Sequence, residues 1–334
     1  MSVGLAVIAF ASVGGANEVA PGSASGEAGS GERDDYVDSL RQRRDRAPCD
    51  RELVLKLVNE QNKQRRHTEA LVDVGRFEAA CGASFFQLQR ATVYALQQLG
   101  RSADAVALES AMLVTDPRSS DLWWWRADDR AKAGQPLAAL ADLRQTFALA
   151  RSASYSRYAA GLALDIAGAA RRPCEAVFAL DLFVAVQGGT LVERTERKVR
   201  ALDAAEGCAD RLGRGSAALS QGRSFKVTVG GVPGRFTVER QAGTTVLAVD
   251  FARRAGVVAG GEPTDTLLGA RLVRGPIGVA DLAIEGAVAP DVAVVISSDL
   301  PADIDGVLGL SALWLFETQV AEDGTLGLSG TSGH

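Results

Sequence analysis

Histidine is scarce in this chain, which has 334 residues and only two histidines, His67 and the terminal His334. Zinc sites built on several histidines and Ser-His-Asp or Cys-His catalysis are therefore nearly excluded. No Gly-rich phosphate loop followed by Lys-Ser/Thr and no Cys-x-x-Cys pair occurs either. We accordingly expect no metal and no cofactor, and we expect His67 to lie on the surface of a helix.

Positive charge and long apolar runs are also in short supply. The 36 Lys and Arg residues are outnumbered by 41 Asp and Glu residues, giving a formal net charge of −5. This balance argues against a nucleic-acid partner, since binding to nucleic acid depends on neutralising phosphates. The longest uncharged stretch, residues 1–17, is shorter than the ~20 apolar residues that span a membrane. No stable membrane span is expected.

The first 46 residues predict a leader followed by a tether. VGLAVIAFASVGGA (3–16) is a short apolar run that ends in small residues, as in a secretory signal, although no Lys or Arg precedes it. We interpret 1–20 as a signal-like segment, and a disordered apolar N-terminus is the alternative. The Gly/Ser-rich and charged stretch that follows predicts a flexible linker over 21–46. An exported protein, periplasmic or secreted, is expected.

The four cysteines fall at matching places in the helical pattern. Cys49 opens one amphipathic segment and Cys81 closes the next, and Cys174 and Cys208 stand in the same relation. In an antiparallel helical hairpin the start of the first helix lies beside the end of the second, within disulfide reach. We therefore predict two disulfides, Cys49–Cys81 and Cys174–Cys208, and an oxidising compartment. Buried free thiols are the alternative expected of a cytosolic protein.

Residues 47–212 predict helices that repeat. Gly100 and Gly134 are 34 residues apart, and an alanine follows five residues after each. Ala70 and Ala176 continue that series at intervals of 35 and 37 residues. A period of 34 with a small residue in the turn resembles the tetratricopeptide repeat, most clearly in 91–117 and 123–150. The resemblance implies about four helix pairs that bind a peptide or protein.

Three consecutive tryptophans lie within this region. Successive helical residues point ~100° apart, so Trp123, Trp124 and Trp125 cannot all face one core. Trp123 occupies the position where the repeat family has its large core aromatic. Trp124 and Trp125 either pack against a neighbouring repeat or line a groove as a platform for a peptide.

The pattern changes to β over residues 223–330. FKVTV (225–229) and RFTVE (235–239), with glycines between them, predict a β-hairpin. A strand, TVLAV (245–249), and a short helix over 250–257 follow, and DGVLGLSALWLF comes near the end. This order resembles a single-lobe retropepsin-like aspartic protease, in which an Asp-Thr/Ser-Gly-Ala turn follows the hairpin. The resemblance implies that Val307, Leu308 and Gly309 form the loop that frames the active site.

The catalytic turn of that family is not kept here. Its Asp corresponds to Glu239, its Thr or Ser to Arg240 and its Gly to Gln241, while Ala242 is retained. Glu is longer by a methylene, and we expect the Arg240 guanidinium to hold Glu239 ionised, which disfavours a shared proton. Gln241 adds a side chain where the family needs glycine. The resemblance thus implies a degenerate site.

The chain is expected to be an α + β multidomain protein, with an all-α repeat solenoid before an all-β retropepsin-like lobe. Our preferred hypothesis is an exported pseudo-protease scaffold that binds a peptide or protein and has no enzymatic activity. The alternative is an atypical aspartic endopeptidase, which would need a homodimer through the C-terminal lobe to bring two copies of Glu239 together.

Overall fold

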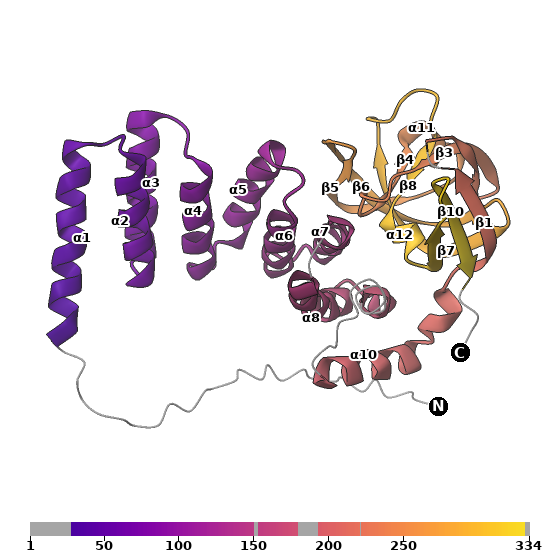
Figure 1. The fold of residues 1–334 in the computed structure, drawn as a ribbon, viewed down its shortest axis with the longest axis horizontal. Coiled ribbons are helices and arrows are strands. Elements are labelled where there is room, and N and C mark those ends of the chain that lie inside the picture. The colour runs from indigo at the N-terminus through magenta and orange to yellow at the C-terminus, as the bar shows by residue number, and fades with distance from the viewer. Residues whose placement is uncertain (1–27, 150–152, 180–192, 221, 331–334) are drawn as a thin grey trace, which may run out of the picture.

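The computed structural model describes residues 28–149, 153–179, 193–220 and 222–330. Within these ranges a row of helices leads into a β domain (Figure 1). The signal-like segment 1–20 and the first linker residues, 21–27, lie outside the described residues. None of the helices in these ranges is long and apolar enough to cross a membrane.

The helical part consists of hairpins whose two helices pack on each other and on the next hairpin. Complete hairpins among the described residues are α2 with α3, α4 with α5, and α6 with α7. Residues 173–179 are also helical, and they follow α8. The bounds of the helices before the β domain are α1 Ala28–Arg46, α2 Arg51–Lys63, α3 His67–Cys81, α4 Phe86–Gln98, α5 Ser102–Thr115, α6 Ser120–Lys132, α7 Pro136–Leu149, α8 Ala153–Ala169, α10 Glu193–Glu206 and the 3₁₀ helix η1 Cys208–Arg211.

The turns inside the hairpins repeat one backbone geometry. Each has a residue with positive φ, and the amide of the next residue closes the helix end on a carbonyl five residues earlier. Five residues after each of these turn positions is a buried alanine. The predicted helical repeat is therefore confirmed in its turns and spacing. The turn residues are Arg65, Gly100, Gly134 and Arg171 (φ 60°, 67°, 78° and 57°), and the alanines are Ala70, Ala105, Ala139 and Ala176.

Arg65 holds a left-handed conformation that costs a side-chain-bearing residue about 1–2 kcal/mol. Glycine escapes that cost but loses about 0.5–1 kcal/mol in backbone entropy. Arg65→Gly is therefore expected to raise the free energy of unfolding by about 0.5–1 kcal/mol in urea titrations. The matched control, Gly100→Ala, adds a Cβ that meets nothing within 4 Å and should lower it by about 1 kcal/mol. A loss of stability in Arg65→Gly would contradict this account.

The predicted flexible linker over 21–46 is wrong for its second part, because residues 28–46 form α1. Val37 and Leu40 are fully buried in a small apolar cluster with Leu53 and Leu57 of α2. The Arg44 guanidinium donates to Asp73 at 2.8 Å, with both side chains buried. The charged residues of this segment are typical of a solvated linker. Val37 and Leu40, at helical spacing, and the buried ion pair of Arg44 nevertheless hold α1 against the repeats.

Two further side chains test the expectations for the helices. His67 is buried, contrary to the surface position we expected, because its Nδ1 lies 3.1 Å from Asn62 Oδ1 and its ring packs edge-on against Tyr94. Trp123 is fully buried, as expected for the core aromatic. Its indole N–H donates to the Pro117 carbonyl at 2.8 Å.

The C-terminal part is mostly β, as the sequence predicts, and starts earlier than the expected residue 223. Its first strand, β1, pairs with β7 and β10. The order in the sheet is β5-β6-β2-β3-β8-β4-β7-β1-β10-β9. The bounds are β1 Arg214–Ser220, β2 Phe225–Val229, β3 Val232–Val238, β4 Thr245–Ala248, α11 Val249–Arg254, β5 Ala259–Leu268, β6 Arg271–Ile284, β7 Ala287–Ser297, β8 Gly306–Leu308, α12 Leu310–Leu313, β9 Phe316–Val320 and β10 Thr325–Gly330.

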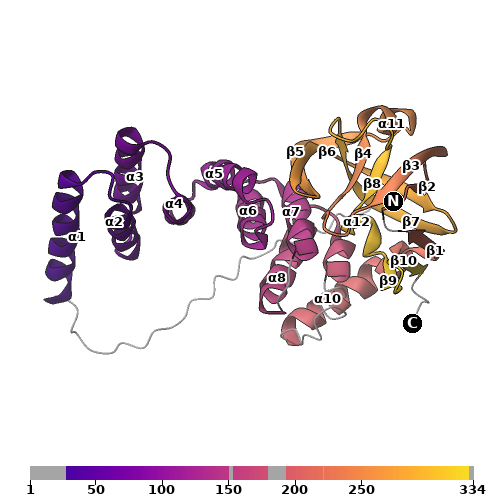
Figure 2. The same cartoon turned by 45° about the horizontal axis from the view of Figure 1, so that its top comes forward.

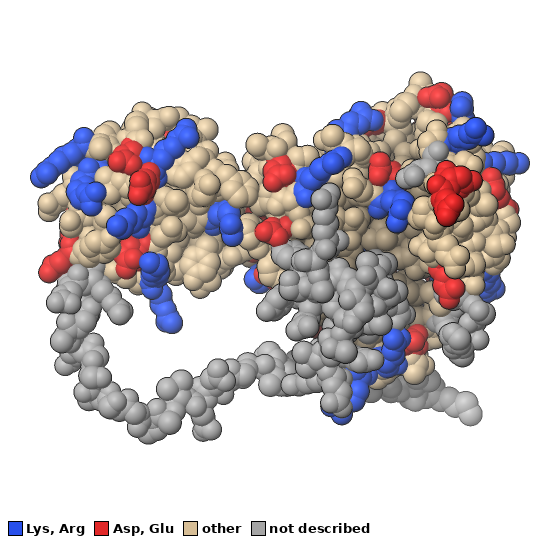
Figure 3. Space-filling model, in the orientation of Figure 1, with Lys and Arg blue, Asp and Glu red and all other residues tan. Residues whose placement is uncertain are grey.

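The two parts are in contact where α7 lies against β5 and α12 (Figure 2). Apolar side chains from both parts share a core, with Phe147 of α7 packing against strands and helices alike. The helices and the β domain therefore meet through packed side chains at α7. On the face drawn in Figure 3, basic and acidic side chains are interspersed.

Candidate functional site

The turn at 239–242 lies in the connection between β3 and β4. The short strand β8 lies between these two strands, parallel to β3 and antiparallel to β4. The Glu239 amide donates to the Leu308 carbonyl at 3.0 Å, and the Leu310 amide donates to the Ala242 carbonyl at 2.8 Å. The Gly309 amide donates to Thr245 Oγ1 at 3.1 Å. The structure thus brings the turn at 239–242 and the segment 307–309 together.

The side chains of this turn do not form the arrangement expected from the sequence. The Glu239 carboxylate accepts a hydrogen bond from the Gln241 amide at 3.0 Å and so caps its own turn. Arg240 is exposed, and among the described residues no ion pair joins it to Glu239. The expected pairing of Arg240 with Glu239 is therefore wrong, because the Glu239 carboxylate accepts from a backbone N–H of its own turn and Arg240 is exposed.

Helix α7 covers this turn with one glutamine. The Gln145 amide nitrogen donates to the Gln241 carbonyl at 2.7 Å. Its oxygen accepts from the Gly243 amide at 2.9 Å, the Leu267 amide at 2.9 Å and the Thr266 hydroxyl at 3.1 Å. One side chain from the helices thereby satisfies backbone groups of both the turn and β5.

Gly243 allows this close approach. A Cβ built at Gly243 would lie 2.3 Å from the Gln145 backbone nitrogen, far inside any real contact. Ala242 and Gly243 are both buried. The face of the turn beyond Gly243 is therefore occupied by α7 and closed to another chain.

A second junction between the two parts is a buried cluster of four charged side chains. Arg126 of α6 forms two hydrogen bonds to Asp142 of α7, at 2.9 and 2.8 Å, and one to Asp265 of β5 at 2.8 Å. Arg130 donates to Asp142 and to the Thr264 hydroxyl at 2.8 and 2.9 Å. Burial by itself would lower the pKa of Arg126, but Asp142 and Asp265 raise it above its ordinary value.

Trp124 and Trp125, the candidates for a peptide-binding groove, are both half-buried. Trp124 packs against the apolar cluster that includes Ala127 and Ala139. Trp125 packs on the cluster around Trp123, and the Arg90 guanidinium lies 4.6 Å from its ring centroid. These contacts favour packing between repeats over exposure to a peptide.

Both predicted disulfides are present. Cys49 is bonded to Cys81, and Cys174 to Cys208, across 32 and 34 residues of chain. The second bond joins the start of the helical segment at 173–179 to η1, next to β1. Among the described residues, no group of three or more His, Cys, Asp and Glu side chains is placed to hold a metal ion.

Replacing three side chains of the turn together tests what they contribute to stability. The triple variant Glu239→Asp, Arg240→Thr, Gln241→Gly is expected to change the Tm by no more than a few degrees. Gln145 contacts only backbone groups of the turn, and Asp can still accept from the amide of residue 241. Loss of folding would show that the native side chains hold a network of their own, and the decayed-turn interpretation would have to be dropped.

No family model matches the chain, and no curated protein matches it. Solved structures that are similar include a MamA protein, at 13% identity and a TM-score of 0.40 over 46% of this chain and 82% of that one. MamA from Desulfovibrio magneticus RS-1 has 10% identity and a TM-score of 0.38 over 53% and 88%. A tetratricopeptide repeat protein from Parabacteroides merdae has 14% identity and a TM-score of 0.35 over 52% and 65%.

Proposed function

We propose that this protein is an exported, non-catalytic scaffold that binds a peptide or protein. In this proposal the repeats are of the tetratricopeptide kind and the β domain is a degenerate retropepsin-like lobe. The hairpin, turn, strand and short helix follow one another as in that family, and segment 307–309 lies against the turn, which supports the assignment of the lobe.

The observation that supports a protein without protease activity is the packing of α7, through Gln145, against the turn at 239–242. An aspartic protease site needs two carboxylates that share a proton, so two copies of Glu239 would have to meet across the turn. Glu239 caps its own backbone, and the adjoining face at Gly243 is covered by α7. Nothing in this geometry favours the endopeptidase alternative or a homodimer through this face.

A peptide library, incubated with the full chain at acidic and neutral pH, tests the proposal. We expect no cleavage at either pH, and we expect selected library members to bind equally well to the protein and to Glu239→Ala. Arg240→Ala, at the exposed neighbouring position, is the control for nonspecific effects on the turn. Cleavage that is abolished by Glu239→Ala would overturn the proposal.

Export is tested through the disulfides, which are typical of oxidising compartments. Protein recovered from the periplasm or medium should yield two linked peptide pairs, Cys49 with Cys81 and Cys174 with Cys208, in mass mapping without reductant. Reduction should lower the free energy of unfolding by about 3–4 kcal/mol per bond on the loop-entropy account. Four free thiols in such protein would contradict the two disulfides and would remove their support for the export proposal.

A further inference from the structure

A cleft lies between the helices and the β domain, and residues of both parts line it. It consists of two adjoining hollows of about 100 and 450 Å³ that share Arg172 and Ala293 in their walls. Because the walls are shared, we treat the two as one and call it the junction cleft.

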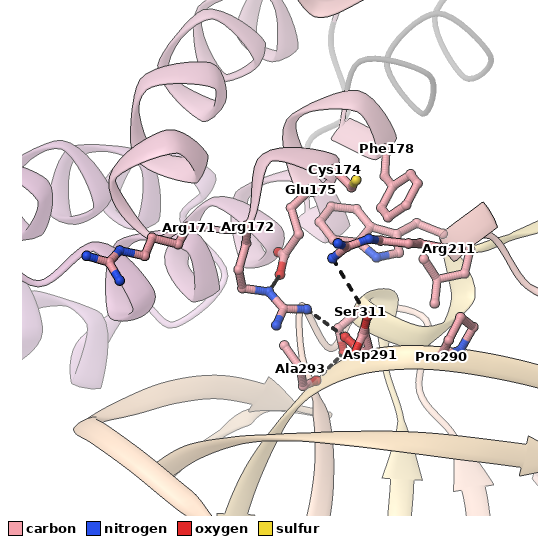
Figure 4. A pocket seen from close by; sticks show the side chains of 12 residues that line it. Arg171, Arg172, Cys174, Glu175, Phe178, Arg211, Pro290, Asp291, Ala293 and Ser311 are labelled. Atoms are coloured by element: carbon pink, nitrogen blue, oxygen red, sulfur yellow. Dashed lines mark hydrogen bonds and ion pairs between the residues drawn. The ribbon is translucent and has the colours of Figure 1, made fainter. Parts of the chain in front are cut away.

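One end of the junction cleft is cationic (Figure 4). Arg172 and Arg211 both point toward Asp291 there, while Arg171 points away. Arg172 donates to the Asp291 carbonyl at 2.6 Å. Arg211 lies 3.7 Å from the Asp291 carboxylate in a half-exposed pair that leaves much of its guanidinium open to solvent.

The lining of the cleft has more basic than acidic side chains, with Arg144, Arg171, Arg172 and Arg211 against Glu175 and Asp291. Buried Arg144 and the less buried Arg172 both pair with the single carboxylate of Glu175. Although burial would raise the pKa of Glu175, the two guanidinium groups hold it below its ordinary value, so the carboxylate is ionised. Arg144 and Arg172 thus share one carboxylate, while Asp291 pairs with Arg211 and has Asp281 beside it, with Oδ1 2.8 Å from the Asp291 amide nitrogen. Arg172 and Arg211 are both partly exposed, so a ligand carboxylate can still form charge-assisted hydrogen bonds with them.

The other end is apolar and open. Its walls include Leu137 of α7, Ile277 and Val279 of β6, and Val258 before β5. Val258 and Val279 are 81% and 44% exposed, which is uncommon for valines that line a hollow. Gly260, exposed on the outermost strand β5, lies in the same wall. A ligand with apolar side chains and a peptide backbone fits this end better than a bare anion does.

We propose that the junction cleft binds the C-terminal end of an apolar peptide. The terminal carboxylate approaches Arg172 and Arg211, and the preceding side chains lie on Val258, Ile277 and Val279. This inference rests on the proposed function, because it names where and by what chemistry the scaffold would bind a peptide. Inorganic phosphate would satisfy the charge but leave the valines exposed.

Calorimetric titration of the full chain with a Val/Ile-rich hexapeptide, as its free acid and as its C-terminal amide, tests the proposal. We expect the acid to bind at least about tenfold more tightly, since a charge-assisted hydrogen bond is lost in the amide. Arg211→Gln should reduce that preference several-fold, because Arg172 is left as the single partner, whereas Arg101→Gln, at an exposed position on the turn before α5, should leave it unchanged. Val258→Asp should weaken the binding of both peptides, and Val114→Asp, at a similarly exposed position on α5, should weaken the binding of neither.

Equal binding of acid and amide, or an acid preference that Arg211→Gln leaves unchanged, would overturn the proposal. Tighter binding of decanoate than of the peptide acid would do so as well, because it would identify a fatty-acid site. None of these results affects the proposed function, which fails instead if library peptides are cleaved.

Discussion

Replacing Asp142 with Ala is expected to lower the free energy of unfolding by about 3–5 kcal/mol. Asp142 is fully buried and accepts hydrogen bonds from both Arg126 and Arg130, which are buried too. Without it, the two guanidinium groups keep Asp265 as their acidic partner, so one buried positive charge is left uncompensated. Chemical denaturation followed by far-UV circular dichroism measures the loss.

Asp128→Ala is the matched control, because Asp128 lies on the same helix as Arg126 and forms an exposed pair with Lys132. Exposed ion pairs contribute little to stability, so Asp128→Ala should lower the free energy of unfolding by less than about 1 kcal/mol. Equal effects of the two substitutions would show that the buried charges are not coupled as the geometry indicates.

Replacing Glu109 with Gln is expected to stabilise the protein by about 2–3 kcal/mol at neutral pH. Glu109 is fully buried in α5. Burial, with the nearby charge of Asp129 adding to it, raises the pKa of Glu109 to about 10. The native protein therefore keeps a proton that the unfolded chain releases, and glutamine supplies a neutral group of the same size without that cost.

The sign of the pH dependence follows from the raised pKa. Between the ordinary value of 4.5 and about 10, the folded state binds more protons, so stability falls as pH rises. The gain from Glu109→Gln should thus vanish at acidic pH and grow through this window. Unfolding curves at several pH values, with exposed Glu322→Gln as the control, measure it. A gain independent of pH would contradict a protonated Glu109.

The features that could be predicted from sequence are those set by short-range periodicity. Helix pairs, a turn residue followed by an alanine, and the two disulfides, across 32 and 34 residues, all depend on residues close together in the chain. The hairpin of β2 and β3 is likewise local. Such patterns recur along the chain, and so the second instance supports the first.

Contacts across the junction could not be predicted, because the residues involved carry no local signal. Gln145 lies on α7 among alanines and leucines, and nothing there indicates that it binds the turn nearly a hundred residues later. Arg126 and Asp265 are separated by 139 residues. Buried arginines look the same in a sequence as solvated ones, and only the tertiary fold distinguishes them.

The fit between Gly243 and α7 has a consequence for how such proteins can change over generations. Any residue larger than glycine at that position forces the helix away, and any shift of the helix strands the backbone amides that Gln145 satisfies. Substitutions on the two sides must therefore be inherited together. We expect relatives to exchange helical hairpins far from α7 freely, while the stretch from α6 through the β domain passes on as one piece.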